Sequence, residues 1–142
     1  MNKDAEVNKS VLIKAEPSKV WDAIINPKQT KKYMYNSEVI SDWKPGSSII
    51  WRDADSKKLH VQGIILNIEP ERHLKTKDLS IDAGLEDIES NYSSVTYELE
   101  REKDKTLLKV TENNFNGDER RFNDSEKFWN IVLKNLKELL EE

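Results

Sequence analysis

The stretch DSEKFWNIVLKNLKELLE, residues Asp124–Glu141, decides the fold, because it alone in the chain shows sustained helical periodicity. Its apolar residues recur at intervals of three and four, which is typical of an amphipathic helix with one buried face. These residues are Trp129, Val132, Leu133, Leu136, Leu139 and Leu140. Asn123 or Asp124 can cap the helix, and Glu126 completes a capping box with Asn123. We therefore expect one long C-terminal helix that packs on a core.

The region before this helix has a different period, because apolar residues alternate with polar ones from Ser37 onward. Turn signals such as Lys44-Pro45-Gly46 and Glu69-Pro70-Glu71 separate the alternating runs. Such alternation is typical of strands with one face on a core. The predicted strands are Glu38–Ser41, Ser48–Arg52, Leu59–Ile68, His73–Lys77, Ser94–Arg101 and Thr106–Asn113.

The N-terminal region adds one strand and two short helices. The run VNKSVLIKA, residues Val7–Ala15, predicts the first strand. A helix over Ser18–Ile25 follows Pro17, and a second short helix is expected over Pro27–Tyr35. We expect Trp21 to anchor the first helix against the sheet.

This order of elements predicts an α+β fold in which a curved antiparallel β-sheet of about six to seven strands packs on the long C-terminal helix. A chain of 142 residues has the size of one domain, so we expect a single domain over residues 1–142.

Composition excludes several functions. The chain has 23 basic and 27 acidic residues, a net charge of −4, so nucleic acid is not an expected partner. It has no cysteine, which excludes disulfides, thiolate nucleophiles and zinc–cysteine sites. The N-terminal residues lack the apolar segment of a secretory signal, and no later run is apolar enough to span a membrane. We expect a cytoplasmic protein without membrane insertion.

Six motifs spread over most of the chain carry a resemblance to a known family. They are AEPSKVWDAIINP (Ala15–Pro27), DWKPGSSIIW (Asp42–Trp51), VQGIILNIEPERHL (Val61–Leu74), SSVTYELE (Ser93–Glu100), TLLKVTENNF (Thr106–Phe115) and FWNIVLKNLKELLE (Phe128–Glu141). In their order and spacing they are similar to the activator of heat-shock-protein ATPase homologue family, in the START-like (SRPBCC) superfamily. The resemblance implies a helix-grip fold, in which the sheet wraps around the C-terminal helix.

The same resemblance implies three classes of function. The favoured one is a small apolar or lipid-like ligand-binding domain with a cavity between sheet and helix. The second is a co-chaperone-like interaction module whose partner is a chaperone, and the third is a cyclase- or hydratase-type enzyme. The sequence departs from the family pattern at Tyr33-Met34, where a Trp-Phe-like pair is usual. The eukaryotic activator also has a separate N-terminal domain on which its chaperone contacts depend, so the resemblance implies the fold more directly than chaperone activation.

The inward faces of the predicted elements supply the candidate ligand-binding residues. They are Tyr33, Met34, Ile49, Trp51, Val61, Ile65, Val95, Tyr97, Leu108, Val110, Glu112, Trp129, Val132, Leu133 and Leu136. The alternative for each apolar residue is that it belongs to a closed core. Glu112 faces inward by alternation, and its alternative is a solvated strand end. Gly63 within a strand indicates a bulge or a close approach of the helix.

No catalytic residue, metal site or cofactor is predicted. His60 and His73, the only histidines, are both expected at the surface. The Asp53-x-Asp55 sequence begins like a calcium loop but lacks the glycine and the distal glutamate. An apolar cavity with only a tyrosine and a glutamate leaves proton-transfer chemistry as the weakest alternative.

Overall fold

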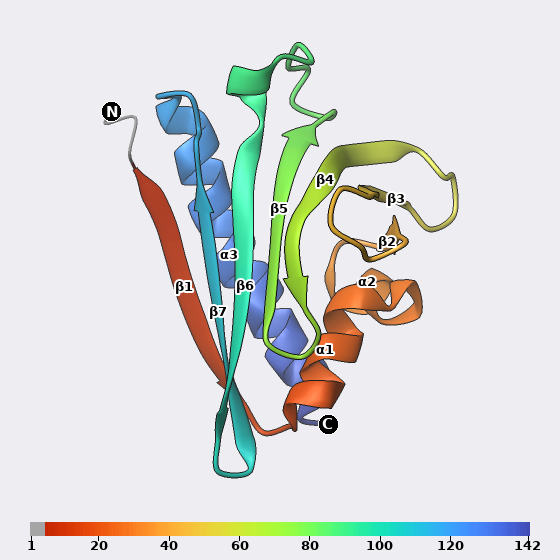
Figure 1. The fold of residues 1–142 in the computed structure, drawn as a ribbon, viewed down its shortest axis with the longest axis vertical. Helices are drawn as coiled ribbons and strands as arrows, with labels where there is room; N and C mark the ends of the chain where they lie inside the picture. The colour runs from red at the N-terminus through yellow and green to blue at the C-terminus, as the bar shows by residue number, and fades with distance from the viewer. Residues whose placement is uncertain (1–4) are drawn as a thin grey trace.

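Seven strands form one antiparallel sheet in the computed structural model, which describes residues 5–142. The strand order is β1-β7-β6-β5-β4-β3-β2, so β1 and β2 are the edges (Figure 1). The bounds are β1 Glu6–Ile13, β2 Ser37–Ser41, β3 Ser48–Asp53, β4 Leu59–Glu69, β5 His73–Ser80, β6 Ser93–Glu102 and β7 Lys105–Asn113. Strand number and antiparallel pairing confirm the predicted sheet.

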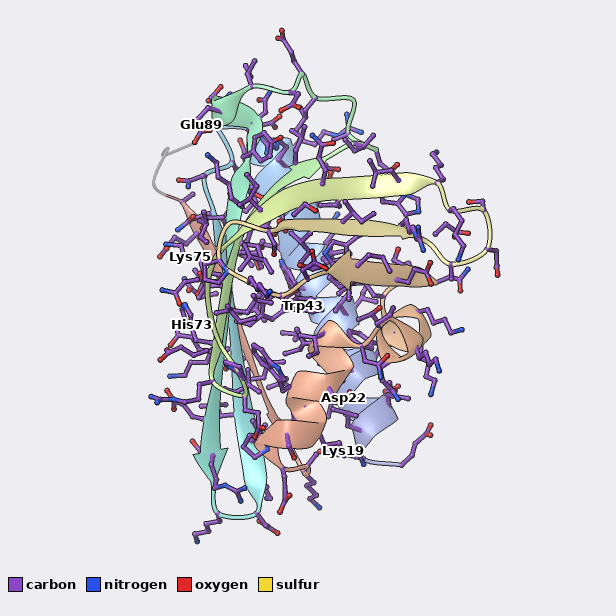
Figure 2. All side chains as sticks on the ribbon, turned by 45° about the vertical axis from the view of Figure 1, so that its right-hand side comes forward. Lys19, Asp22, Trp43, His73, Lys75 and Glu89 are labelled. Atoms are coloured by element: carbon purple, nitrogen blue, oxygen red, sulfur yellow. The ribbon has the colours of Figure 1, made fainter. Side chains whose placement is uncertain are left out.

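Alternation sets which face of each strand is buried. In β5, Leu74 and Thr76 are buried, whereas His73 and Lys75 point to the face away from the helices (Figure 2). The same inner face of the sheet carries Ile49, Ile65, Val95, Leu108 and Val110, all of them buried. Period-two patterning therefore predicted the core face of the sheet correctly.

The helices lie on this inner face. Their bounds are α1 Pro17–Ile25, α2 Pro27–Tyr33 and α3 Glu119–Leu140, and a short 3₁₀ turn η1 spans Glu89–Asn91. Figure 1 shows α3 running along the sheet behind β1, β7 and β6, with α1 and α2 beside its C-terminal end. Among residues 5–142, no helix combines the length and the apolarity that a membrane crossing requires.

The first two helices are joined by packing and by hydrogen bonds. Proline opens each of them, and the Asn26 side chain caps α2 by accepting a hydrogen bond from the backbone N–H of Lys28 at 3.0 Å. The hydroxyl of Tyr33 donates to the carbonyl oxygen of Ala23 at 2.6 Å, which ties α2 to α1. Trp21 is 6% exposed and belongs to the core cluster, so the expectation that it anchors α1 is confirmed.

The predicted start of the C-terminal helix is wrong, because α3 begins at Glu119 rather than at Asp124. Asp118 is the cap, and its side chain accepts hydrogen bonds from the backbone N–H groups of Arg120 at 3.0 Å and Arg121 at 3.2 Å. The added turn is held by Phe122, whose ring packs edge-to-face on Phe115 with centroids 5.7 Å apart. A cap and one aromatic contact therefore extend the helix beyond its periodic segment.

Two register shifts bend the sheet around the helix. One lies between Ile65 and Asn67 of β4, opposite β5. The other is opposite β3, where Trp51 pairs with Val61 and Arg52 pairs with Leu59, which leaves His60 as the extra residue. Bulges increase local twist and redirect a side chain. Figure 1 shows that β4 curves strongly along its length.

The cap of α3 gives a test of the helix start. Asp118→Ala should lower the free energy of unfolding by about 1 kcal/mol, because two backbone N–H groups lose their acceptor. Asn123→Ala, at the position expected to cap the helix from the sequence, should cost less than about 0.5 kcal/mol because Asn123 is exposed within α3. Urea unfolding of both variants measures the difference, and equal losses would contradict the observed start.

Candidate functional site

A cavity of about 700 Å³ lies between the sheet and the first half of α3, and it is partly open to solvent. The helix contributes Arg121, Asp124, Ser125, Phe128 and Trp129. Further along α3, Val132, Leu133 and Leu136 are buried in the core and do not line the cavity. The helix thus packs directly on the core through its second half and leaves a space under its first half.

Seven of the predicted ligand-binding residues line this cavity, namely Met34, Trp51, Val61, Val95, Tyr97, Glu112 and Trp129. The other eight are buried in the core cluster outside the cavity wall, namely Tyr33, Ile49, Ile65, Leu108, Val110, Val132, Leu133 and Leu136. Alternation identifies the face of a strand, but not the position along that face at which the helix leaves the sheet.

Aromatic side chains form much of the apolar wall. The Trp129 ring lies edge-to-face with Tyr97, centroids 5.8 Å apart, and with Phe128, centroids 5.2 Å apart. Tyr35 stacks on Phe128 at 5.9 Å, and Phe115 also lines the space. Sequence reasoning missed Tyr35, Phe115 and Phe128; Tyr35 is the last residue of the second predicted helix, and Phe115 follows the last predicted strand.

Glu112 of β7 joins the helix to the sheet within this wall. Its Oε1 accepts hydrogen bonds from the Ser125 hydroxyl at 2.5 Å and from Trp129 Nε1 at 2.9 Å, both on α3. Its Oε2 accepts one from the Ser93 hydroxyl of β6 at 2.7 Å. Three donors compensate a carboxylate for the water it loses on burial. The inward orientation expected from alternation is therefore present, with the side chain fully engaged.

Asp78 of β5 is a second carboxyl group in the wall, and unlike Glu112 it has an oxygen without a hydrogen-bond partner among residues 5–142. Its Oδ1 is buried without a hydrogen-bond partner in the described part of the chain, while the residue as a whole is partly exposed and lines the cavity. Burial raises the pKa of Asp78 to about 7; the Thr76 hydroxyl opposes the rise and the charge of Glu112 adds to it. Asp78 therefore changes protonation near neutral pH.

Gly63 provides the room for this carboxyl group. Gly63 of β4 pairs with Asp78 of β5, and a Cβ at Gly63 would collide with the carbonyl oxygen of Lys77 and with Oδ1 of Asp78. The close approach expected at Gly63 is thus present, although the approaching group is the neighbouring strand rather than the helix. The register shift of β4 on its β5 side lies further along, after Ile65.

Asp78 lies outside the strand predicted from the sequence, which ended at Lys77. The observed strand continues to Ser80; Leu74 and Thr76 are buried, and Asp78 lines the cavity. Extending the alternation by one step, opposite the conspicuous Gly63, would have found it. The strand was predicted to end at Lys77 because Asp78 and Ser80 are polar and do not continue the apolar alternation.

Charged groups surround the rim. His60 was expected on the opposite face but lines the cavity, because the bulge in β4 redirects it, and its Nδ1 lies 2.6 Å from Oδ2 of Asp82. The Arg121 guanidinium donates to the carbonyl oxygens of Phe115 at 3.2 Å and Asn91 at 3.0 Å. Burial, and then the nearby Tyr33, Asp78 and Glu112, raise the pKa of Tyr97 well above its usual value, so its hydroxyl stays protonated. No group of three or more potential metal ligands occurs within residues 5–142.

Comparison with known proteins identifies relatives of this architecture. A family model described as Activator of Hsp90 ATPase homolog 1-like protein matches residues 14–141. The solution structure of a protein from Cytophaga hutchinsonii is 34% identical, covers 99% of this chain and 97% of its own, and has a TM-score of 0.80. No curated protein matches the chain.

Two more distant structures share the fold. The Aha1 dimer from Colwellia psychrerythraea is 20% identical, with 96% of each chain covered and a TM-score of 0.78. An HSP90 activator from Plasmodium falciparum is 18% identical, with 95% of each chain covered and a TM-score of 0.77. At this identity, the likeness establishes the common fold alone.

The raised pKa of Asp78 predicts how the stability of the protein depends on pH. This pKa is raised in the folded state, so the contribution of Asp78 to stability is greatest at low pH and is lost as the pH rises through about 7. Asp78→Asn should remove this loss. When the pH is raised from 5 to 8, the free energy of unfolding of the variant should therefore increase by about 2 kcal/mol relative to that of the wild type.

Urea unfolding at the two pH values measures the gain. Asp104→Asn, in the exposed turn between β6 and β7, is the matched control and should follow the wild type. An Asp78→Asn variant that follows the wild type at both pH values would show that Asp78 is well solvated.

Proposed function

We propose a function for this chain, which belongs to the Activator of Hsp90 ATPase homolog 1-like family: it binds a small apolar or lipid-like molecule in the cavity between the sheet and α3. The observation that carries the proposal is the cavity itself, since about 700 Å³ lies within the range of small-molecule sites, about 300 to 1,000 Å³.

The composition of the wall supports this function. Small-molecule sites are mostly apolar and aromatic, with a few convergent polar groups that orient the ligand. Here Trp51, Val61, Val95 and Trp129 supply apolar surface, and Asp78 supplies a polar group without a protein partner at its Oδ1. A ligand that covers these side chains gains the free energy of removing apolar surface from water, about 25 cal/mol per Å².

The Glu112 hydrogen bonds also favour a maintained cavity over a closed core. A helix held only by apolar contacts is free to settle until the space is filled. Ser125 and Trp129 instead attach the first half of α3 to a carboxylate on β7 and another strand supplies Ser93, so the separation of helix and sheet is set by directional bonds. We infer that the cavity persists without a ligand.

Interaction with an Hsp90-type chaperone is the second candidate. The observation that favours it is the family description, which names activation of the Hsp90 ATPase. This function would use the outer surface of the domain and would not require the cavity. Stimulation of the ATPase rate of purified Hsp90 by this chain tests it, and stimulation that survives a blocked cavity would separate the two functions.

Filling the cavity should prevent ligand binding without unfolding the protein. The neutral fluorescent probe N-phenyl-1-naphthylamine should bind wild type with a stoichiometry of one. Val61→Phe extends a partly exposed wall residue into the space, so it should reduce probe affinity at least tenfold and change the free energy of unfolding by less than about 1 kcal/mol.

Val110→Phe is the matched control. Val110 is 1% exposed and lies in the core outside the cavity, so the larger side chain should cost about 1 to 3 kcal/mol through overpacking. Fluorescence titration and urea unfolding give both quantities. If wild type fails to bind the probe and Val61→Phe destabilises as much as Val110→Phe, the space is a closed core and the binding function is wrong.

A further inference from the structure

We propose that the ligand of this cavity carries a protonated amine on an apolar body, and that the carboxyl group of Asp78 receives the amine. The proposal rests on the binding function above and names the chemical class of the ligand. It follows from the charges of the wall, from the bonding of each carboxyl group and from the aromatic side chains of the same wall.

The wall of the cavity carries an excess of negative charge. Its acidic residues are Asp53, Asp78, Asp82, Glu112 and Asp124, and its basic residues are Arg121 and His60. A cleft lined mainly by one sign of charge concentrates the field and attracts ions of the opposite sign. Arg121 donates to two backbone carbonyl groups, which further reduces its capacity to hold an anion. The wall therefore favours a cation and disfavours a fatty acid or another carboxylate.

Asp78 differs from the other wall carboxyl groups in its bonding. Glu112 accepts three hydrogen bonds, and Asp82 pairs with His60. Asp53 accepts from the backbone N–H groups of two residues in its own turn, and Asp124 is exposed to solvent. Only at Asp78 is a buried oxygen left without a partner in the wall as described. This oxygen lies against Gly63, so the carboxylate lacks a compensating donor there among the described residues and gains from a positive charge brought close to it in the cavity.

Aromatic side chains near Asp78 suit the same class of ligand. Tyr97 lines the same cavity as Asp78, and its ring packs against Trp129, which also lines it. Aromatic faces attract ammonium groups, by about 0.5 to 2 kcal/mol in proteins. The same rings cover an apolar body, so one wall serves both parts of the ligand.

The protonation of Asp78 gives this binding a characteristic pH dependence. An ammonium group binds the ionised carboxylate, and Asp78 has a pKa of about 7 in the free protein, so amine affinity should rise roughly tenfold from pH 6 to pH 8. The other groups that face Asp78 are Glu112, Tyr97 and Thr76, with His60 and Asp82 at the rim. His60 is the histidine of the wall and contacts Asp82, so His60→Gln serves as a control.

The experiment compares two probes that differ in one group, 2-(1-naphthyl)ethylamine and 2-(1-naphthyl)ethanol. Isothermal titration calorimetry of the full chain at pH 8 should show the amine binding at least tenfold more tightly than the alcohol. In Asp78→Asn this ratio should fall to about one, and in the distant control Asp104→Asn it should be retained. The rise with pH should appear for the amine alone, and should persist in His60→Gln.

The outcomes separate this proposal from the binding function. If both probes bind wild type equally and Asp78→Asn changes neither, the amine proposal is wrong and the cavity remains a binding site. If the amine is preferred but the preference survives in Asp78→Asn, or if its pH dependence disappears in His60→Gln, the assignment to Asp78 is wrong. If neither of these two probes nor N-phenyl-1-naphthylamine binds, both proposals fail together.

Discussion

Three hydrogen bonds, two from α3 and one from β6, converge on the carboxylate of Glu112 and position the first half of α3 over the cavity. Ser125 and Trp129 of α3 donate to this carboxylate of β7, and the Ser93 hydroxyl of β6 donates to its other oxygen. Beyond this point the helix packs into the core through Val132, Leu133 and Leu136. Because the carboxylate of Glu112 is compensated by three donors, the first half of α3 keeps a defined position over the cavity while the second half packs on the core.

The two inward carboxyl groups lie on β7 and β5, on either side of β6, and they have different roles. Glu112 is satisfied by the protein, so it fixes the helix and is not free for a ligand. Asp78 occupies the space that Gly63 leaves and has a buried oxygen without a partner, which is a cost to stability that a ligand can repay. Groups in this condition often mark functional sites, because folding alone does not favour them.

Much of the fold was predictable from the sequence, since alternation and helical periodicity report directly on burial. The second half of α3 and the inner faces of the strands followed from these patterns. The start of α3 did not, because only Phe122 is apolar among residues 119–123, the part of α3 before the periodic segment. The site was harder to predict, since the wall depends on where the helix leaves the sheet and on a bulge at His60, and Asp78 lay one residue beyond the predicted end of its strand.

The carboxyl ¹³C resonance of Asp78 reports directly on the ionisation of this group. Titration of the free protein should give a midpoint near pH 7, and 2-(1-naphthyl)ethylamine should lower that midpoint by about one unit or more, because bound ammonium stabilises the carboxylate. A midpoint near the ordinary value of about 4 in the free protein would contradict the account, as would a midpoint near 7 that saturating amine leaves unchanged.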